Sequence, residues 1–219
     1  MKVHDYRCLW VGMLASAFAL NMQLVAQGWL VYEMTSSAIN LTWVTLAFML
    51  PQVVFSLLGG VLADRVRKKP LIGWTPAING IATLVMGGVI MSGHVTFWDF
   101  IWVGALNGTV LSLSIPARTA LIPEVVGEPL MFNAMAFNTA SWNLSRILGP
   151  ALAGFMIAIF ADGDTSSTFG VGLVYFLLSI LYFVSALSIL FLKHEGRPVP
   201  GERKSPMAET ADGLRYVMN

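Results

Sequence analysis

The sequence predicts an all-α, polytopic membrane protein with six transmembrane helices, and three observations support this prediction. Of the 219 residues, 56% are hydrophobic and only 11% are charged, against about a quarter charged in an ordinary soluble domain. The charged residues are almost all confined to short segments between long apolar runs. Each run can supply the roughly 20 residues that a helix needs to cross the hydrocarbon core of a bilayer.

The six apolar runs give the expected helices in chain order. These helices are expected over residues 8–32, 41–63, 71–92, 98–117, 131–160 and 169–192. The first run is too long for the apolar region of a signal peptide, and it contains Asn21, Gln23 and Gln27, so we interpret it as a transmembrane helix. The fifth run is the one run with an internal charge, Arg146.

The basic residues predict the orientation of the helices. Every Lys and Arg except Arg146 lies before the first run, after the second or fourth run, or in the C-terminal tail. The other three connections carry Glu33, Asp99, Asp162 and Asp164, but no Lys or Arg. Because cytoplasmic connections are enriched in Lys and Arg, both termini are expected on the cytoplasmic side.

The connection after the second run has an unusual pattern of small and charged residues. Residues 59–71 read GGVLADRVRKKPL. The small residues at positions 59, 60 and 63 would let another helix approach closely, and Asp64 would lie at the membrane boundary beside a basic turn. The alternative is that the basic cluster only determines topology and Asp64 balances its charge.

This segment resembles the signature of the loop between helices two and three in the major facilitator superfamily, G-x-L-A-D-R-x-G-R-K/R. The matching residues are Gly60, Leu62, Ala63, Asp64, Arg65, Lys68 and Lys69, whereas Arg67 replaces the second glycine of the signature. The resemblance implies a cytoplasmic latch, formed by Gly60, Asp64, Arg65 and Lys68, that stabilises an outward-facing state. We expect Arg118, at the cytoplasmic end of the fourth run, to pair with Asp64.

The fifth run carries small residues at every fourth position: Ser141, Ser145, Gly149 and Ala153. This spacing predicts a smooth helix face for close packing, and a packing seam alone would explain it. The segment also resembles the antiporter motif of the same superfamily, G-x-x-x-G-P-x-x-G-G. Ser145, Gly149, Pro150 and Gly154 fall on its positions, with Ser145 and Ala153 in place of glycines. The resemblance implies export rather than uptake.

Polar residues inside the apolar runs are candidates for a substrate path, because polar groups avoid lipid and membrane charges are costly. These candidates are Asn21, Gln27, Asn107, Asn143 and Arg146. The alternative is that they bond neighbouring helices or, for Arg146, that its side chain extends to the membrane surface. No Asp or Glu lies deep in a run, so proton coupling would need Glu33, Asp99 or residues outside this chain.

Two further segments, Ser114–Glu124 and Trp29–Tyr32, resemble a bacterial group of enterobactin-exporter-like and macrolide-efflux-like permeases, the transmembrane secretion effectors. The resemblance implies one six-helix half of a major facilitator fold in the bacterial inner membrane. The implied function is secondary active export of a small amphipathic molecule, of drug or siderophore type, by alternating access.

The same resemblance predicts a second six-helix half as partner. Residues 193–219 are expected to form a cytoplasmic linker tail, with Met207, Ala211, Leu214 and Met218 at helical spacing, truncated before that half. One alternative is a natural half-transporter that acts as a dimer. The other is a remnant of a truncated gene that does not transport.

Other classes of function have little support in the sequence. The three histidines are far apart, Cys8 is the single cysteine, and no G-x-x-x-x-G-K-[ST] phosphate loop occurs. The apolar runs offer no set of nucleophile, base and metal ligands. We therefore expect no enzyme activity, no cofactor, no metal and no nucleic-acid partner.

Overall fold

A computed structural model describes residues 3–160 and 168–196, apart from the side chains of Val3, Leu57, Val61 and Asp64. Within these residues the chain forms helices α1 (Val3–Thr35), α2 (Ala38–Arg65), α3 (Lys68–Met91), α4 (Phe97–Val126), α5 (Glu128–Phe160) and α6 (Thr168–Leu190). All six are long and apolar enough to cross a membrane, which confirms the predicted all-α polytopic fold class. The expected tail helix around Met207–Met218 lies outside the described residues.

Several helices extend past the apolar runs of the sequence. The expected fourth helix stopped before Arg118, whereas α4 continues to Val126. Hydropathy detects only the lipid-compatible part of a helix, while the backbone hydrogen bonds continue into the polar boundary. The extension matters for the site, because it carries Arg118 and Glu124 on the same rigid element.

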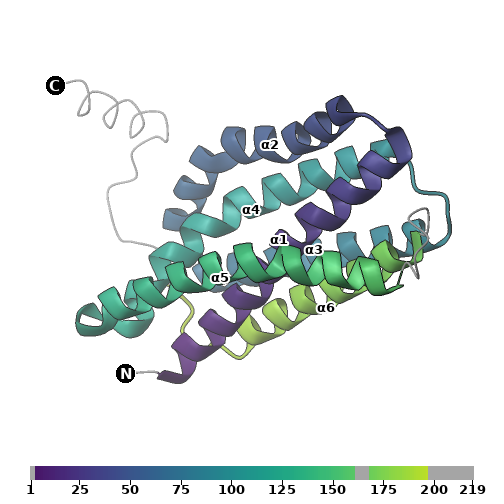
Figure 1. Ribbon diagram of the computed structural model, residues 1–219. Helices are drawn as coiled ribbons and strands as arrows, with labels where there is room; N and C mark the ends of the chain where they lie inside the picture. The colour runs from purple at the N-terminus through teal and green to yellow at the C-terminus, as the bar shows by residue number, and fades with distance from the viewer. Residues whose placement is uncertain (1–2, 161–167, 197–219) are drawn as a thin grey trace.

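The helices run back and forth through an elongated bundle (Figure 1). The N-terminal end of α1, the turn between α4 and α5 and the C-terminal end of α6 lie at one end, on the left of the view. The connections from α1 to α2 and from α3 to α4 lie at the opposite end. The left end carries the basic turn between α2 and α3, and we call it the basic end.

Helices α2 and α4 approach each other closely through glycines. A Cβ atom at Gly108 would lie 2.0 Å from the carbonyl oxygen of Phe48, and one at Gly59 would lie 2.2 Å from that of Ser112. Any side chain at these positions would force the two backbones apart. By contrast, a Cβ at Gly60 would meet none of the described atoms within 4 Å, so the close approach expected at Gly59 and Gly60 occurs at Gly59.

The interior contains two apolar clusters, one toward each end of the bundle. The cluster at the basic end includes Leu9, Met13, Ile72, Ala117 and Ile189. The cluster toward the other end includes Ala19, Met86, Phe100, Ala153 and Tyr182. Along α1, α3, α5 and α6 the polar residues Ser16, Thr75, Ser145 and Ser185 fall between members of the two clusters. A polar layer therefore divides the apolar core.

Candidate functional site

Within the polar layer, side chains from α1, α3, α4 and α6 are joined by hydrogen bonds. Arg118 Nε donates to Ser114 Oγ at 3.0 Å, and Thr75 Oγ1 donates to the same hydroxyl at 3.0 Å. A terminal nitrogen of Arg118 lies 3.4 Å from Ser16 Oγ, and Ser16 also bonds Ser185. These bonds satisfy polar groups for which lipid offers no hydrogen-bond partner. They also connect four helices around the guanidinium of Arg118.

A small cavity of about 30 Å³ lies within this layer. Its lining includes Ser16, Thr75, Asn79, Arg118 and Tyr182. Asn79 Oδ1 is buried and has no hydrogen-bond partner among the described residues. A cavity of this size has room for water but not for a drug-sized ligand, since ligand pockets are roughly ten times larger.

Arg118 was expected to pair with Asp64. The guanidinium instead has hydroxyl partners on α4 and α1, as described above. Asp64 lies in the last turn of α2, and its side chain is outside the described part of the chain. The pairing of Asp64 with Arg118 therefore stays a prediction.

A second group of polar residues joins α3, α4 and the segment after α6 at the basic end. The Lys68 ammonium, only 1% exposed, forms an ion pair with Glu124, and His194 Nε2 lies 3.2 Å from the other carboxylate oxygen of Glu124. We call Lys68, Glu124 and His194 the basic-end network. A lysine this buried is found almost only with a partner, because an uncompensated charge would be costly.

Backbone contacts reinforce the basic-end network. The backbone N–H groups of Lys68 and Lys69 donate to the carbonyl oxygens of Gly196 and Glu195, at 3.2 and 3.1 Å. Gly196 has a φ of +62°, and a Cβ there would lie 2.8 Å from Lys68 Cβ. Only glycine fits at position 196, because its backbone has a positive φ and lies against Lys68. The contact satisfies N–H groups that have no partner within the first turn of α3.

Two more contacts tie the same end together. The buried carboxylate of Asp5, in the first turn of α1, accepts a hydrogen bond from the backbone N–H of Lys193 at 3.1 Å. On the surface, Arg67 forms an ion pair with Glu195 at 3.2 Å. The ends of α1, α3, α4 and α6 are therefore connected by charged groups at one membrane boundary.

The ladder of small residues on α5 packs against α1. Ser141, Ser145, Gly149 and Ala153 are all buried. Trp10 Nε1 donates to Ser141 Oγ at 2.8 Å, and Asn21 Nδ2 donates to Ser145 Oγ at 3.2 Å. A Cβ at Gly149 would lie 3.0 Å from Asn21 Cβ. The predicted close packing along this face is confirmed, and α5 continues through Pro150.

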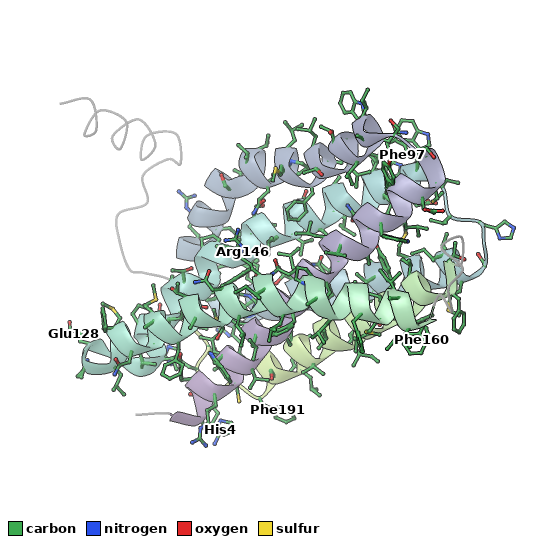
Figure 2. The ribbon with its side chains drawn as sticks, viewed as in Figure 1. His4, Phe97, Glu128, Arg146, Phe160 and Phe191 are labelled. Atoms are coloured by element: carbon green, nitrogen blue, oxygen red, sulfur yellow. The ribbon has the colours of Figure 1, made fainter. Side chains whose placement is uncertain are left out.

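The candidate path residues fall into two sets. Asn21 bonds α5, and Gln27 and Asn107 are buried in the bundle. Asn143 and Arg146 lie on an exposed face of α5, which also carries Gly154 of the antiporter-like motif. Figure 2 shows Arg146 near the middle of α5, away from both ends of the helix. The described residues do not gather the five candidates into one pocket.

Sequence reasoning missed the partners of Lys68. Glu124 ends the Ser114–Glu124 segment, but it lies 56 positions from Lys68 in the chain, and no short motif joins them. A signal did exist, because Glu124, like Lys68, lies in a connection that the distribution of basic residues predicts to be cytoplasmic. His194 and Tyr182 carried no comparable signal.

One of the two acidic residues considered for proton coupling has a structural role. Asp99, considered above for proton coupling, accepts from the backbone N–H of Thr96 at 2.8 Å and completes a capping box at the start of α4. Within the described residues, no cluster of three or more His, Cys, Asp or Glu side chains is arranged to hold a metal.

Comparison with known proteins gives a consistent set of relatives. A family model described as transmembrane secretion effector matches residues 1–219. The enterobactin exporter EntS of Escherichia coli is 26% identical over 223 residues, covering 100% of this chain and 50% of that protein. The multidrug efflux pump Tap of Mycolicibacterium fortuitum is 28% identical over 205 residues, covering 90% and 48%.

A third relative is the multi-drug resistance efflux pump PmrA of Streptococcus pneumoniae, 28% identical over 165 residues, or 74% of this chain and 37% of that protein. The chain thus spans about half, or less, of the length of the curated relatives it matches.

Proposed function

This chain belongs to the transmembrane secretion effector family of the major facilitator superfamily, and from that premise we propose that it forms the six-helix half of a secondary active exporter. The proposed substrate is a small amphipathic molecule of drug or siderophore type. Similarity to drug efflux pumps and to an enterobactin exporter supports this substrate class. The proposed location is the bacterial plasma membrane, with the basic end in the cytoplasm.

The observation that carries the proposal is the basic-end network. An exporter that alternates between two states needs contacts at one membrane surface that are complete in one state and broken in the other. Lys68 and Glu124, from α3 and α4, form an ion pair at the basic end, and we propose that this pair is the contact that changes between the two states. The segment after α6 is bonded to the same turn. Separating Glu124 from the buried ammonium of Lys68 would cost free energy, and this cost favours the state with the pair intact.

We propose that the exposed faces of α2 and α5 receive the second six-helix half. The side chains of Leu50 and Val53 in α2 and of Ile147 in α5 are 65%, 71% and 70% exposed. Asn143 and Arg146 share the exposed part of α5. A cation surrounded by lipid would be costly, so a partner surface or a water-filled path is the favourable environment for Arg146. The substrate path would then lie between the halves, with Asn143 and Arg146 on its wall.

An accumulation assay tests the proposal. An efflux-deficient bacterium expressing the whole natural gene product that carries this chain should accumulate less ethidium than the same strain with an empty vector. Dissipating the ion gradients with ionophores should abolish the difference, because a secondary transporter draws on them. Lys68→Glu should raise accumulation, since it places two carboxylates together in the basic-end network.

The alternatives make different predictions in the same assay. A half-transporter that dimerises would lower accumulation when residues 1–219 are expressed alone. A non-transporting remnant would leave ethidium accumulation equal to that of the vector strain, although the protein is detected in the membrane. That last result would overturn the proposed function.

A further inference from the structure

A groove of about 480 Å³ lies between α3 and α6 at the basic end, apart from the polar layer. Its walls include Gly73 and Ala77 of α3 and Ala186 and Ile189 of α6. Trp74 and Leu190 also line it and are 69% and 67% exposed. The groove therefore opens to the outside of the bundle, and most of its lining is apolar.

Two basic side chains lie at the mouth of this groove. Arg67 and Lys69 line it together with Glu195, so the lining carries two positive charges and one negative charge. Lys69 Nζ donates to the carbonyl oxygen of Leu192, and an ammonium has three donors in all. Arg67 is 68% exposed and forms its ion pair with Glu195 on the surface. Because an exposed ion pair contributes little free energy, another anion can replace Glu195 at low cost.

The groove extends along α3 from Lys69 to Ala77. From Lys69 to Ala77 the helix rises about 12 Å, at 1.5 Å per residue. That distance takes the wall from a charged boundary into the hydrocarbon region, and small residues at positions 73 and 77 leave room along the helix. Trp74 lies close to the charged boundary, which is where tryptophan side chains are enriched in membrane proteins.

We propose that this groove binds an anionic phospholipid of the leaflet at the basic end, with its phosphate at Arg67 and Lys69 and an acyl chain along Gly73, Ala77 and Ala186. Net positive charge at the mouth and an apolar floor match the two parts of such a lipid, and basic pockets between helices on the cytoplasmic side are suited to acidic headgroups. The site differs from the substrate path, since it lies on α3 and α6 rather than on α5.

Quenching of Trp74 by brominated lipids tests the proposal. The protein is reconstituted into phosphatidylcholine bilayers containing either phosphatidylglycerol or phosphatidylcholine brominated near the headgroup end of the acyl chain. Subtracting the signal of Trp74→Phe isolates Trp74 from the other tryptophans. Brominated phosphatidylglycerol should quench Trp74 at a roughly tenfold lower mole fraction, because each basic side chain contributes about a fivefold preference and Glu195 offsets part of it.

Variants identify which groups give the preference. Arg67→Gln with Lys69→Gln should remove it, whereas Arg7→Gln with Lys193→Gln removes two charges from the same end outside the groove and should preserve it. Ala77→Leu keeps both cations but fills the groove, and it should also weaken quenching by phosphatidylglycerol. Equal quenching of the unmodified protein by both lipids, or a preference that survives loss of Arg67 and Lys69, would overturn the proposal.

Discussion

At the scale of single residues, adjacent basic side chains have different environments. Lys68 is 1% exposed and paired with Glu124, whereas Arg67 is 68% exposed and paired with Glu195. A buried charge loses hydration that its partner must replace, while an exposed pair exchanges freely with water. Neighbouring positions in one motif therefore have different importance for stability.

This contrast gives a paired prediction. Lys68→Met should lower the free energy of unfolding by about 2 kcal/mol, because Glu124 loses its ammonium partner and is itself partly exposed. Arg67→Met should lower it by less than about 1 kcal/mol. Denaturant unfolding in detergent micelles measures both. Equal losses for the two variants would contradict the environment assigned to Lys68.

Glycines in the same segment give a second prediction at residue scale. Gly59→Ala should destabilise the protein by about 1–3 kcal/mol, since its Cβ would lie 2.2 Å from the Ser112 oxygen. Gly60→Ala should be neutral or slightly stabilising, because its Cβ meets open space among the described residues and alanine favours the helix. Thermal unfolding of the two variants in the same detergent provides the comparison, and a larger loss for Gly60→Ala would reject this packing of α2 on α4.

At the scale of helices, the hydropathy of the sequence predicted the six elements because each is a long apolar segment between charged connections. The four-residue ladder on α5 also predicted its buried face, since residues at i and i+4 share one side of a helix. The partner of that face could not be predicted. Trp10 and Ser141 are 131 positions apart, and only the packing of α1 on α5 brings them together.

The candidate site was less predictable than the helices. The signature around Asp64 identified Lys68 but not Glu124, because the ion pair depends on where α4 ends relative to the first turn of α3. Likewise, Arg118 could be assigned to a helix end, but its hydroxyl partners Ser16 and Ser114 come from tertiary packing. Local patterns determine helices, whereas these contacts depend on how six helices assemble.

At the scale of the whole molecule, the distribution of charge predicts an orientation that labelling can test. In a Cys8→Ser background, a cysteine at His94 should react with a membrane-impermeant maleimide on intact cells. A cysteine at Arg67 should react only after permeabilisation. Both positions are exposed at connections between helices, so reactivity reports the side of the membrane. The reverse pattern would contradict a cytoplasmic basic end.

If this chain is one half of a transporter, the exposed apolar faces of α2 and α5 should contact protein in the membrane. Photo-crosslinking measures this contact, with a photoreactive residue in place of Val53 in α2 or Ile147 in α5, in native membranes. Trp74 in α3 is the matched control, because its exposed fraction of 69% is close to the 71% and 70% of the other two.

We expect Val53 and Ile147 to crosslink to protein, either a second six-helix segment or another copy of this chain, and Trp74 to crosslink to lipid. Crosslinking of all three positions to lipid alone would contradict this expectation.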